Sequence, residues 1–292
     1  MIKGFTYPAT SAKGVCCVLM IAMFFGFAGR ANGQATPLRL ELGVCTSVKN
    51  IPILKRYNYA FIQPGVQDFL NPRDSAAAPN LGIDFPVYAC NGFLPGELKA
   101  VGPDADHDGI LRYAERAFAR AQQAGIGVIV FGSGNSRRIP RGFDRLEAEQ
   151  QFVDLCIALA DRAAVYEVVI CLENLNSGET NLVNTVSEAL TVARRVDRPN
   201  FKLLVDIFHM LREEESPSSI IAAGREYVYH IDIAEVAGRT APGVAGDDFR
   251  PYLRALRDIS YAGKIALECG FTDMETELPE AMKELQHQLN TL

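Results

Sequence analysis

From residue 37 onward the chain repeats one pattern, a short apolar run followed by a longer stretch with apolar residues at three- and four-residue spacing. Short apolar runs bounded by turn residues predict buried strands, whereas the wider spacing predicts amphipathic helices. The clearest helical stretches are residues 109–124 and 145–164. The apolar runs number eight and lie at 38–45, 57–63, 85–91, 126–134, 165–173, 201–209, 228–235 and 263–269.

Eight strands that alternate with helices match the size and count of a (β/α)₈ barrel. The competing architecture, a doubly wound open sheet, usually carries a glycine-rich phosphate-binding turn after its first strand. Here the first run leads into CTSVKN at residues 45–50, which is not such a turn. We therefore predict an α/β fold, a single (β/α)₈ TIM barrel over residues 36–292.

The first 35 residues have a different composition. Lys3 and Lys13 precede an apolar run at 15–28, and Arg30 and several small residues follow it. This order is typical of a secretory signal peptide, and the run is short for a membrane span, which needs about 20 residues. We predict a signal peptide at 1–35 and an exported mature chain, periplasmic or secreted, with no membrane span. An uncleaved anchor is the alternative.

The charge balance argues against a nucleic-acid partner. Asp and Glu outnumber Lys and Arg by 35 to 29, which gives a formal net charge of −6. Proteins that bind nucleic acid usually present a basic surface instead. The cysteines include no C-x-x-C pair, so we expect free thiols, most of them buried in the apolar runs.

Acidic residues interrupt four consecutive apolar runs near their C-terminal ends. An ionised carboxylate in a buried strand is costly unless a partner or a metal compensates it. Because parallel strands end at one rim of a barrel, these four side chains should converge there. Carboxylates suit Mg²⁺ and Mn²⁺, with Co²⁺ and Zn²⁺ as further candidates. The predicted ligands are Glu173, Asp206, Asp232 and Glu268. Taken singly, any of them could instead cap a helix.

At this point the chain resembles a known family, through six segments in order. They are CNGFLPGELKAVGPD (90–104), VIVFGSGNSRRIPRGFD (128–144), CLENLNSGETN (171–181), LLVDIFHMLREEE (203–215), HIDIAEVAGRTAPGV (230–244) and YAGKIALECGF (261–271). The chain is similar to the xylose isomerase-like TIM barrels, which include ketose 3-epimerases and hydroxypyruvate isomerases. The resemblance covers about residues 38–292. It implies a metal-dependent isomerase or epimerase that transfers a proton through an enediolate of a small sugar or keto-sugar.

The resemblance also implies roles for single residues. Glu173, in the pattern L-E-x-x-N, corresponds to a metal ligand that also moves a proton, and Glu268 corresponds to a second ligand and acid/base. Asp206 corresponds to the ligand on the sixth strand. The residues expected to face the substrate are His209, Asn176, Glu179 and Arg239.

Two positions depart from the family pattern. The family usually carries His-x-His on the seventh strand, whereas this chain has His230-x-Asp232. We align Asp232 with the ligand, and because residues i and i+2 share a strand face, His230 should lie one layer deeper and support it. Gln63 stands where relatives often have Glu, which predicts a weakened substrate contact or a changed reaction. Both Gln63 and His230 are counted with the substrate-site residues.

Two further motifs allow more than one interpretation. The spacing of Asp104, Asp106, Asp108 and Glu115 satisfies the EF-hand pattern, which predicts an extra Ca²⁺ site, although the same acids could cap the helix that follows. The turn GSGNSRR at 132–138 could direct Arg137 or Arg138 to an anionic substrate, or leave both arginines in water.

Three functional hypotheses stay open at this stage. The first is a metal-dependent isomerase or epimerase of a small carbohydrate. The second is a metal-dependent lyase or hydrolase of 3-keto-glycosides, and the third is a non-catalytic sugar-binding barrel. Barrels of this kind often self-associate, so a homo-oligomer is a further expectation.

Overall fold

The eight apolar runs form strands in a computed structural model of the chain, which describes residues 41–74 and 82–292. The strands are β1 (Glu41–Val44), β2 (Phe61–Ile62), β3 (Ala89–Cys90), β4 (Val128–Phe131), β5 (Val169–Glu173), β6 (Phe201–Asp206), β7 (Val228–Ile233) and β8 (Lys264–Leu267). Each strand lies inside its predicted run. The segment predicted as a signal peptide falls outside the described residues, so that feature and export stay predictions.

All neighbouring strands pair in parallel, in the order β2-β1-β8-β7-β6-β5-β4-β3. The two ends of this sheet are joined by single bridges, Ile62 to Val87 and Gly65 to Asn91. The sheet therefore curls into a nearly closed barrel, which confirms the predicted fold.

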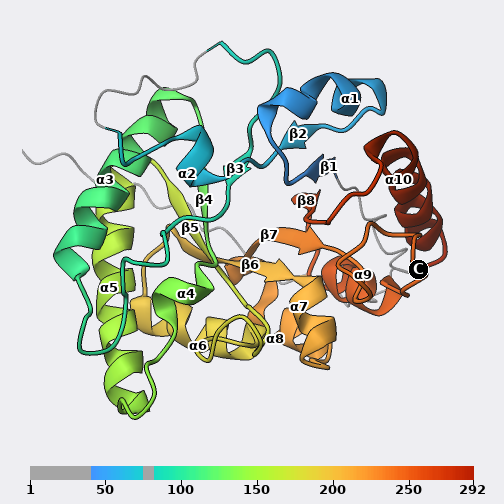
Figure 1. Ribbon diagram of the computed structural model, residues 1–292. Coiled ribbons are helices and arrows are strands. Elements are labelled where there is room, and N and C mark those ends of the chain that lie inside the picture. The colour runs from blue at the N-terminus through green and yellow to red at the C-terminus, as the bar shows by residue number, and fades with distance from the viewer. Residues whose placement is uncertain (1–40, 75–81) are drawn as a thin grey trace, which may run out of the picture. The chain divides into compact units, whose positions relative to one another are not determined.

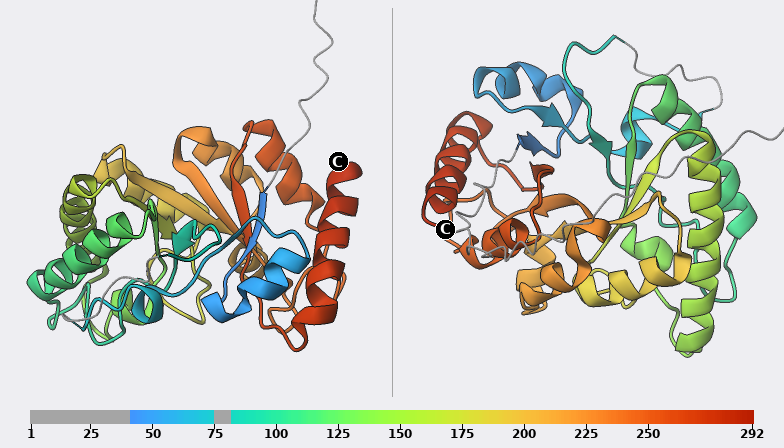
Figure 2. Two further views of the ribbon diagram at one scale, coloured as in Figure 1. Left: turned by 90° about the horizontal axis from the view of Figure 1, so that it is seen from above. Right: turned by 180° about the vertical axis from the view of Figure 1, so that it is seen from behind.

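The longer helices cover the outside of the barrel (Figures 1 and 2). They are α3 (His107–Gln123), α5 (Arg145–Val165), α6 (Val186–Val196), α8 (Ser218–Tyr227), α9 (Arg250–Asp258) and α10 (Met274–Asn290). Short helical segments occupy several loops: η1 (Val48–Asn50), α1 (Ile51–Arg56), α2 (Val66–Phe69), α4 (Gly134–Arg137) and α7 (Ile207–Arg212). None of the described helices is both long and apolar enough to cross a bilayer.

Helix α3 shows how sequence pattern becomes packing, and it corrects the calcium prediction. Its apolar residues recur at three- and four-residue intervals and are buried against the barrel, as Ile110, Ala114 and Phe118 illustrate. The side chain of Asp106 accepts a hydrogen bond from the Gly109 N–H and so caps the helix.

The four acids of the EF-hand pattern therefore do not form a calcium loop. Asp108 and Glu115 both lie within α3, and Glu115 pairs with Arg162 of α5 at 3.1 Å. A twelve-residue calcium loop must stay non-helical over most of its length, because its ligands come from alternating positions along it. The predicted Ca²⁺ site at Asp104, Asp106, Asp108 and Glu115 is wrong because the capping interaction starts a helix there.

Small and medium apolar side chains form part of the core of the described chain. One cluster of buried residues on the strands consists of Ala89, Val128, Val130, Cys171 and Leu204. All five cysteines in the described part of the chain are free thiols, as expected.

Candidate active site

The four predicted ligand residues converge on the C-terminal rim of the barrel. Glu173 ends β5, Asp206 ends β6, Asp232 lies next to the end of β7, and Glu268 directly follows β8. In the sheet, Asp206 is the direct neighbour of Asp232. The parallel arrangement therefore brings together side chains that are up to 95 residues apart in the sequence (268 − 173 = 95).

Their potential ligand atoms form two groups, each within 4.8 Å: Glu173 with Asp206 and His209, and Cys45 with Asp232 and Glu268. Arg239 connects the groups, because its Nη2 lies 3.1 Å from Asp206 Oδ2 and 2.5 Å from Glu268 Oε2. One guanidinium thus faces several carboxylates.

Burial and mutual repulsion disfavour the ionised form of these carboxylates, and one guanidinium compensates this only in part. Burial, together with the charges of Glu268 and Asp206, raises the pKa values of Glu173 and Asp232 well above their ordinary range. Burial also raises the pKa of Asp206 to about 6 and that of Glu268 to about 7, although Arg239 opposes both changes. A divalent cation would favour the ionised form of every one of these groups.

A carboxylate oxygen without a hydrogen-bond partner also indicates that this cluster can bind a cation. Oδ1 of Asp232 is buried and has no hydrogen-bond partner among residues 41–74 and 82–292. Nε2 of His230 lies 3.4 Å from this oxygen but bonds to Gln63 instead, and buried polar atoms are rarely left without a partner. The residues present therefore fit a divalent metal ion.

The hydrogen bonds of His209 make it a donor rather than a metal ligand. This residue lies in the first turn of α7, one turn beyond Asp206, and not on the strand as the apolar run suggested. Its Nδ1 accepts the backbone N–H of Asn176 at 3.1 Å and lies 2.8 Å from the amide Nδ2 of that residue. Burial, assisted by Arg239, lowers the pKa of His209 to about 3, so the ring is neutral and its proton is on Nε2.

That Nε2–H points at two acids without bonding to either. It lies 3.3 Å from Asp206 Oδ2 and 3.7 Å from Glu173 Oε1, and within the described ranges it makes no hydrogen bond. Asn176 also donates to Glu179 at 3.0 Å, and Glu179 lies 3.7 Å from Arg239. The four residues expected to face the substrate are therefore neighbours.

Gln63 and His230 lie beneath Asp232 and hold it. Nε2 of Gln63 donates to Asp232 Oδ2 at 2.8 Å, so its Oε1 faces His230 and accepts from Nε2 at 2.6 Å. Burial lowers the pKa of His230 to about 3, which keeps this ring neutral. The deeper, supporting position expected for His230 matches this geometry, and Gln63 lines the cavity described below.

The loop that follows β7 is organised by Glu235. This buried carboxylate accepts the backbone N–H groups of Gly243 and Gly246 at 2.8 Å each, and the hydroxyl of Thr240 at 2.9 Å. The same loop presents Arg239, whose φ of 52° is in the left-handed region. Glu235 therefore fixes the backbone from which Arg239 reaches the acids.

Arg137 does not face a substrate. It is fully buried, and its Nη2 donates to the backbone carbonyls of Glu173 at 2.8 Å and Val183 at 3.3 Å. The guanidinium thus supports the end of β5 from behind. Gly132 matters here as well, because a Cβ at this position would collide with the Glu173 carboxylate.

A cavity of about 610 Å³ opens beside Glu268. Its lining includes Cys45, Gln63 and Asn91, and Asn91 donates to Glu268 Oε1 at 2.8 Å. The sequence reasoning missed Cys45 and Asn91. Both directly follow strands, β1 and β3, so the strand-end rule that found the acids would have found them had it been applied to the first three strands as well.

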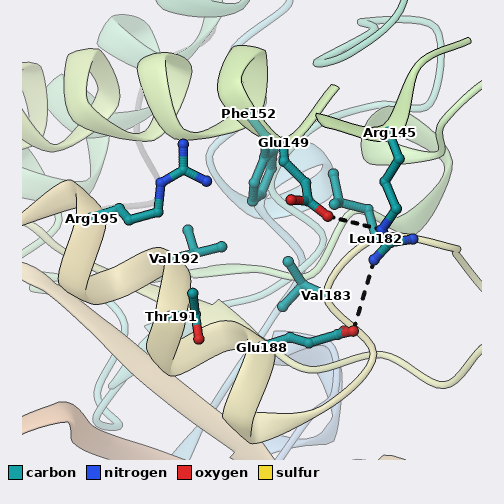
Figure 3. Close-up of a pocket in the computed structure, with 9 residues that line it drawn as sticks. All are labelled: Arg145, Glu149, Phe152, Leu182, Val183, Glu188, Thr191, Val192 and Arg195. Atoms are coloured by element: carbon teal, nitrogen blue, oxygen red, sulfur yellow. Dashed lines mark hydrogen bonds and ion pairs between the residues drawn. The ribbon is translucent and has the colours of Figure 1, made fainter. Parts of the chain in front are cut away.

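A second pocket, of about 110 Å³, lies outside the barrel between α5 and α6 (Figure 3). Its floor is apolar, and at its edge Arg145 pairs with Glu149 at 2.8 Å and with Glu188 at 3.8 Å. Because these charges compensate one another on the surface, we assign no chemistry to this pocket.

Comparison with known proteins identifies related chains. The profile of the xylose isomerase-like TIM barrel family matches residues 73–290. D-psicose 3-epimerase from Ruminiclostridium cellulolyticum is 36% identical over 101 residues, which are 35% of this chain and 34% of that protein. 2-oxo-tetronate isomerase from Pectobacterium atrosepticum is 32% identical over 133 residues, which are 44% of this chain and 50% of that protein. The chain spans between a third and a half of the length of these relatives.

Solved structures show the same fold over a larger share of the chain. A 3-keto-D-glucoside 4-epimerase from E. coli superposes with a TM-score of 0.70 at 18% identity, covering 87% of this chain and 100% of the other. An L-ribulose 3-epimerase gives a TM-score of 0.72 at 16% identity, covering 87% of this chain and 95% of the other. At these identities the comparison confirms the barrel architecture.

Proposed function

Because the chain belongs to the xylose isomerase-like TIM barrel family, we propose that it is a metal-dependent isomerase or epimerase of a small sugar or keto-sugar. The observation that carries the proposal is the convergence of four carboxylates at the C-terminal rim, where Glu268 lines a cavity of about 610 Å³ and one oxygen of Asp232 has no hydrogen-bond partner in the described part of the chain. Burying several carboxylates close together lowers the stability of the fold unless a cation or a ligand compensates their charge.

We assign the metal to Glu173, Asp206, Asp232 and Glu268. Their oxygen donors favour Mn²⁺ or Mg²⁺. When bound, the cation supplies Lewis acidity that stabilises negative charge developing on substrate oxygens. It also compensates the repulsion that raises the pKa values of these acids.

Glu173 and Glu268 are the candidate acid/base pair. They belong to different ligand groups, so two separate carboxylates are available, one to accept a proton and one to return it. One glutamate removes the proton next to the substrate carbonyl and the other returns it. Return to the opposite face inverts the centre, whereas return to the neighbouring carbon interconverts aldose and ketose.

Donors around the acids orient the substrate in this proposal. The free Nε2–H of His209 and the guanidinium of Arg239 are directed at the cluster, so both can donate to substrate oxygens. Asn91 donates to Oε1 of Glu268 and Arg239 donates to Oε2, so the two side chains together fix the position of this acid. Asn176 keeps His209 in the required tautomer.

The test is proton exchange in D₂O, followed by NMR with Mn²⁺ present. The substrates tried first are D-psicose, L-ribulose and 2-oxo-tetronate, because relatives are named for them. Deuterium incorporation beside the carbonyl with product formation is expected, and an Arg145→Ala variant, altered only at the surface pocket, should behave like the wild type. Release of a leaving group from a 3-keto-glycoside, without isomerisation of any sugar, would instead indicate a lyase.

A further inference from the structure

Cys45 lies in the candidate active site although no role has been assigned to it. It directly follows β1, and its Sγ is 3.9 Å from Asp232 Oδ2. The thiol also lies within 4.8 Å of a ligand oxygen of Glu268. A sulfur atom is therefore part of one of the two ligand groups.

The other described cysteines have different surroundings. Cys90, Cys156 and Cys171 are fully buried in the apolar interior. Cys269 is close by in the sequence, but its Sγ is directed at the backbone carbonyl of Ile233 at 3.6 Å. Cys45 differs because its thiol faces carboxylates and borders the cavity.

A second observation at the same place points to a ligand. Oδ1 of Asp232 is nine-tenths or more buried, lies 3.4 Å from His230 Nε2 and lacks a hydrogen-bond partner within residues 41–74 and 82–292, whereas Oδ2, the oxygen nearest the Cys45 thiol, is held by Gln63. The neighbouring group, around His209, offers a ring N–H that cannot bind a cation while Nδ1 accepts the Asn176 amide. The sulfur of Cys45 is thus the soft ligand atom of the site, and it belongs to the group of Asp232 and Glu268.

We propose that Cys45 donates its sulfur to the cation held by Asp232 and Glu268, so that the site prefers a thiophilic divalent ion such as Zn²⁺ or Co²⁺ over Mg²⁺. The proposal rests on the metal site proposed above. Soft thiolate ligands select such ions, and the sulfur lies 3.9 Å from Asp232 Oδ2, which is less than the sum of a metal–sulfur bond of about 2.3 Å and a metal–oxygen bond of about 2.1 Å. Binding replaces the thiol proton with the cation, and the proton goes to solvent.

The test is titration of the metal-free full chain with Co²⁺, followed by near-ultraviolet absorption. A sulfur-to-cobalt charge-transfer band is expected in the wild type and in Cys269→Ser, the matched control. It should be absent in Cys45→Ser and in Cys45→Ala. Calorimetry should show that both Cys45 variants lose about tenfold or more of their Zn²⁺ affinity, while Mg²⁺ affinity changes little. Circular dichroism of the metal-free proteins establishes that each variant is folded.

The failures of the two proposals are distinguishable. If the wild type binds Co²⁺ without the band, or Cys45→Ser keeps its preference for Zn²⁺, the role of Cys45 is overturned and the metal site stands. If the wild type binds none of Zn²⁺, Co²⁺, Mn²⁺ and Mg²⁺, both proposals fail together.

Discussion

Asp232 and Glu235 are three residues apart and both fully buried, yet their surroundings are opposite. Glu235 accepts several hydrogen bonds, including the N–H groups of Gly243 and Gly246 at 2.8 Å each. Asp232 accepts one from Gln63 at 2.8 Å and a weak one from the Cys45 thiol at 3.9 Å, both at Oδ2, and its other oxygen has no hydrogen-bond partner in the described part of the chain. One carboxylate is fully satisfied and the other is not.

Their protonation follows the difference. Burial alone raises the pKa of Glu235, but the N–H groups of Ala245, Gly243 and Gly246 outweigh it and hold the pKa below its usual value. Burial raises the pKa of Asp232 well above its usual value, and the charge of Glu268 adds to the rise. Burial therefore does not separate structural acids from functional ones, whereas the count of hydrogen-bond donors does.

The largest expected effect is on the reaction, at an acid whose pKa is raised by burial, as that of Asp232 is. Glu268→Gln should lower kcat by roughly 10² to 10⁴-fold, because it removes a group that exchanges protons with the substrate. Initial rates with the best sugar at saturating Mn²⁺ measure this, with Arg145→Ala as an off-site control. A rate within tenfold of the wild type would mean that Glu268 is not an acid/base.

The next largest effect concerns metal binding. Saturating Mn²⁺, at about 100 times its Kd, should stabilise the folded wild type by about 2.7 kcal/mol. The melting temperature should rise by several degrees in the wild type and in Arg145→Ala, and stay constant in Asp232→Asn. If the melting temperature of Asp232→Asn rose by the same amount, Asp232 would not be a metal ligand and would not differ from Glu235 in function.

Without metal, we expect the substitution of Glu235 to lower the stability of the fold more than the substitution of Asp232 does. Glu235→Ala leaves several loop N–H groups unsatisfied, which we expect to lower the free energy of unfolding by about 2 kcal/mol. Asp232→Asn replaces a buried carboxyl group that is incompletely hydrogen-bonded, so it should leave the free energy of unfolding unchanged or increase it. Urea titration in EDTA measures both, and equal losses in the two variants would contradict the comparison.

The smallest effect is the pH dependence of metal-free stability. Burial raises the pKa of Asp206 to about 6 and of Glu268 to about 7, so the folded state holds protons that the unfolded state releases. The stability that these two acids contribute should therefore fall as the pH rises from about 4 to about 7. Glu235 acts in the opposite sense, since its lowered pKa contributes stability that is lost as the pH falls below about 4.5. Urea titrations at pH 5, 6 and 7 in EDTA check the slope, which Glu268→Gln should reduce between pH 6 and 7.

Much of the architecture could be predicted because it depends on local pattern. Eight apolar runs separated by helical spacing specify strands and helices, and parallel strands must end on one rim. That rule places Glu173, Asp206, Asp232 and Glu268 together without any knowledge of their contacts. The calcium motif misled because a capping Asp and a loop ligand look alike in sequence, and the helix that begins at His107 resolves the ambiguity.

The role of each residue at the C-terminal rim could not be predicted in this way. It depends on contacts between distant segments, such as Cys45 with Asp232 and Gln63 with His230, which are 187 and 167 residues apart. The tautomer of His209 depends on an amide of a neighbouring loop, and the burial of Arg137 depends on carbonyls at the end of β5. Periodicity encodes which face of an element is buried, whereas the partner of each polar atom is set by how the elements pack around one another.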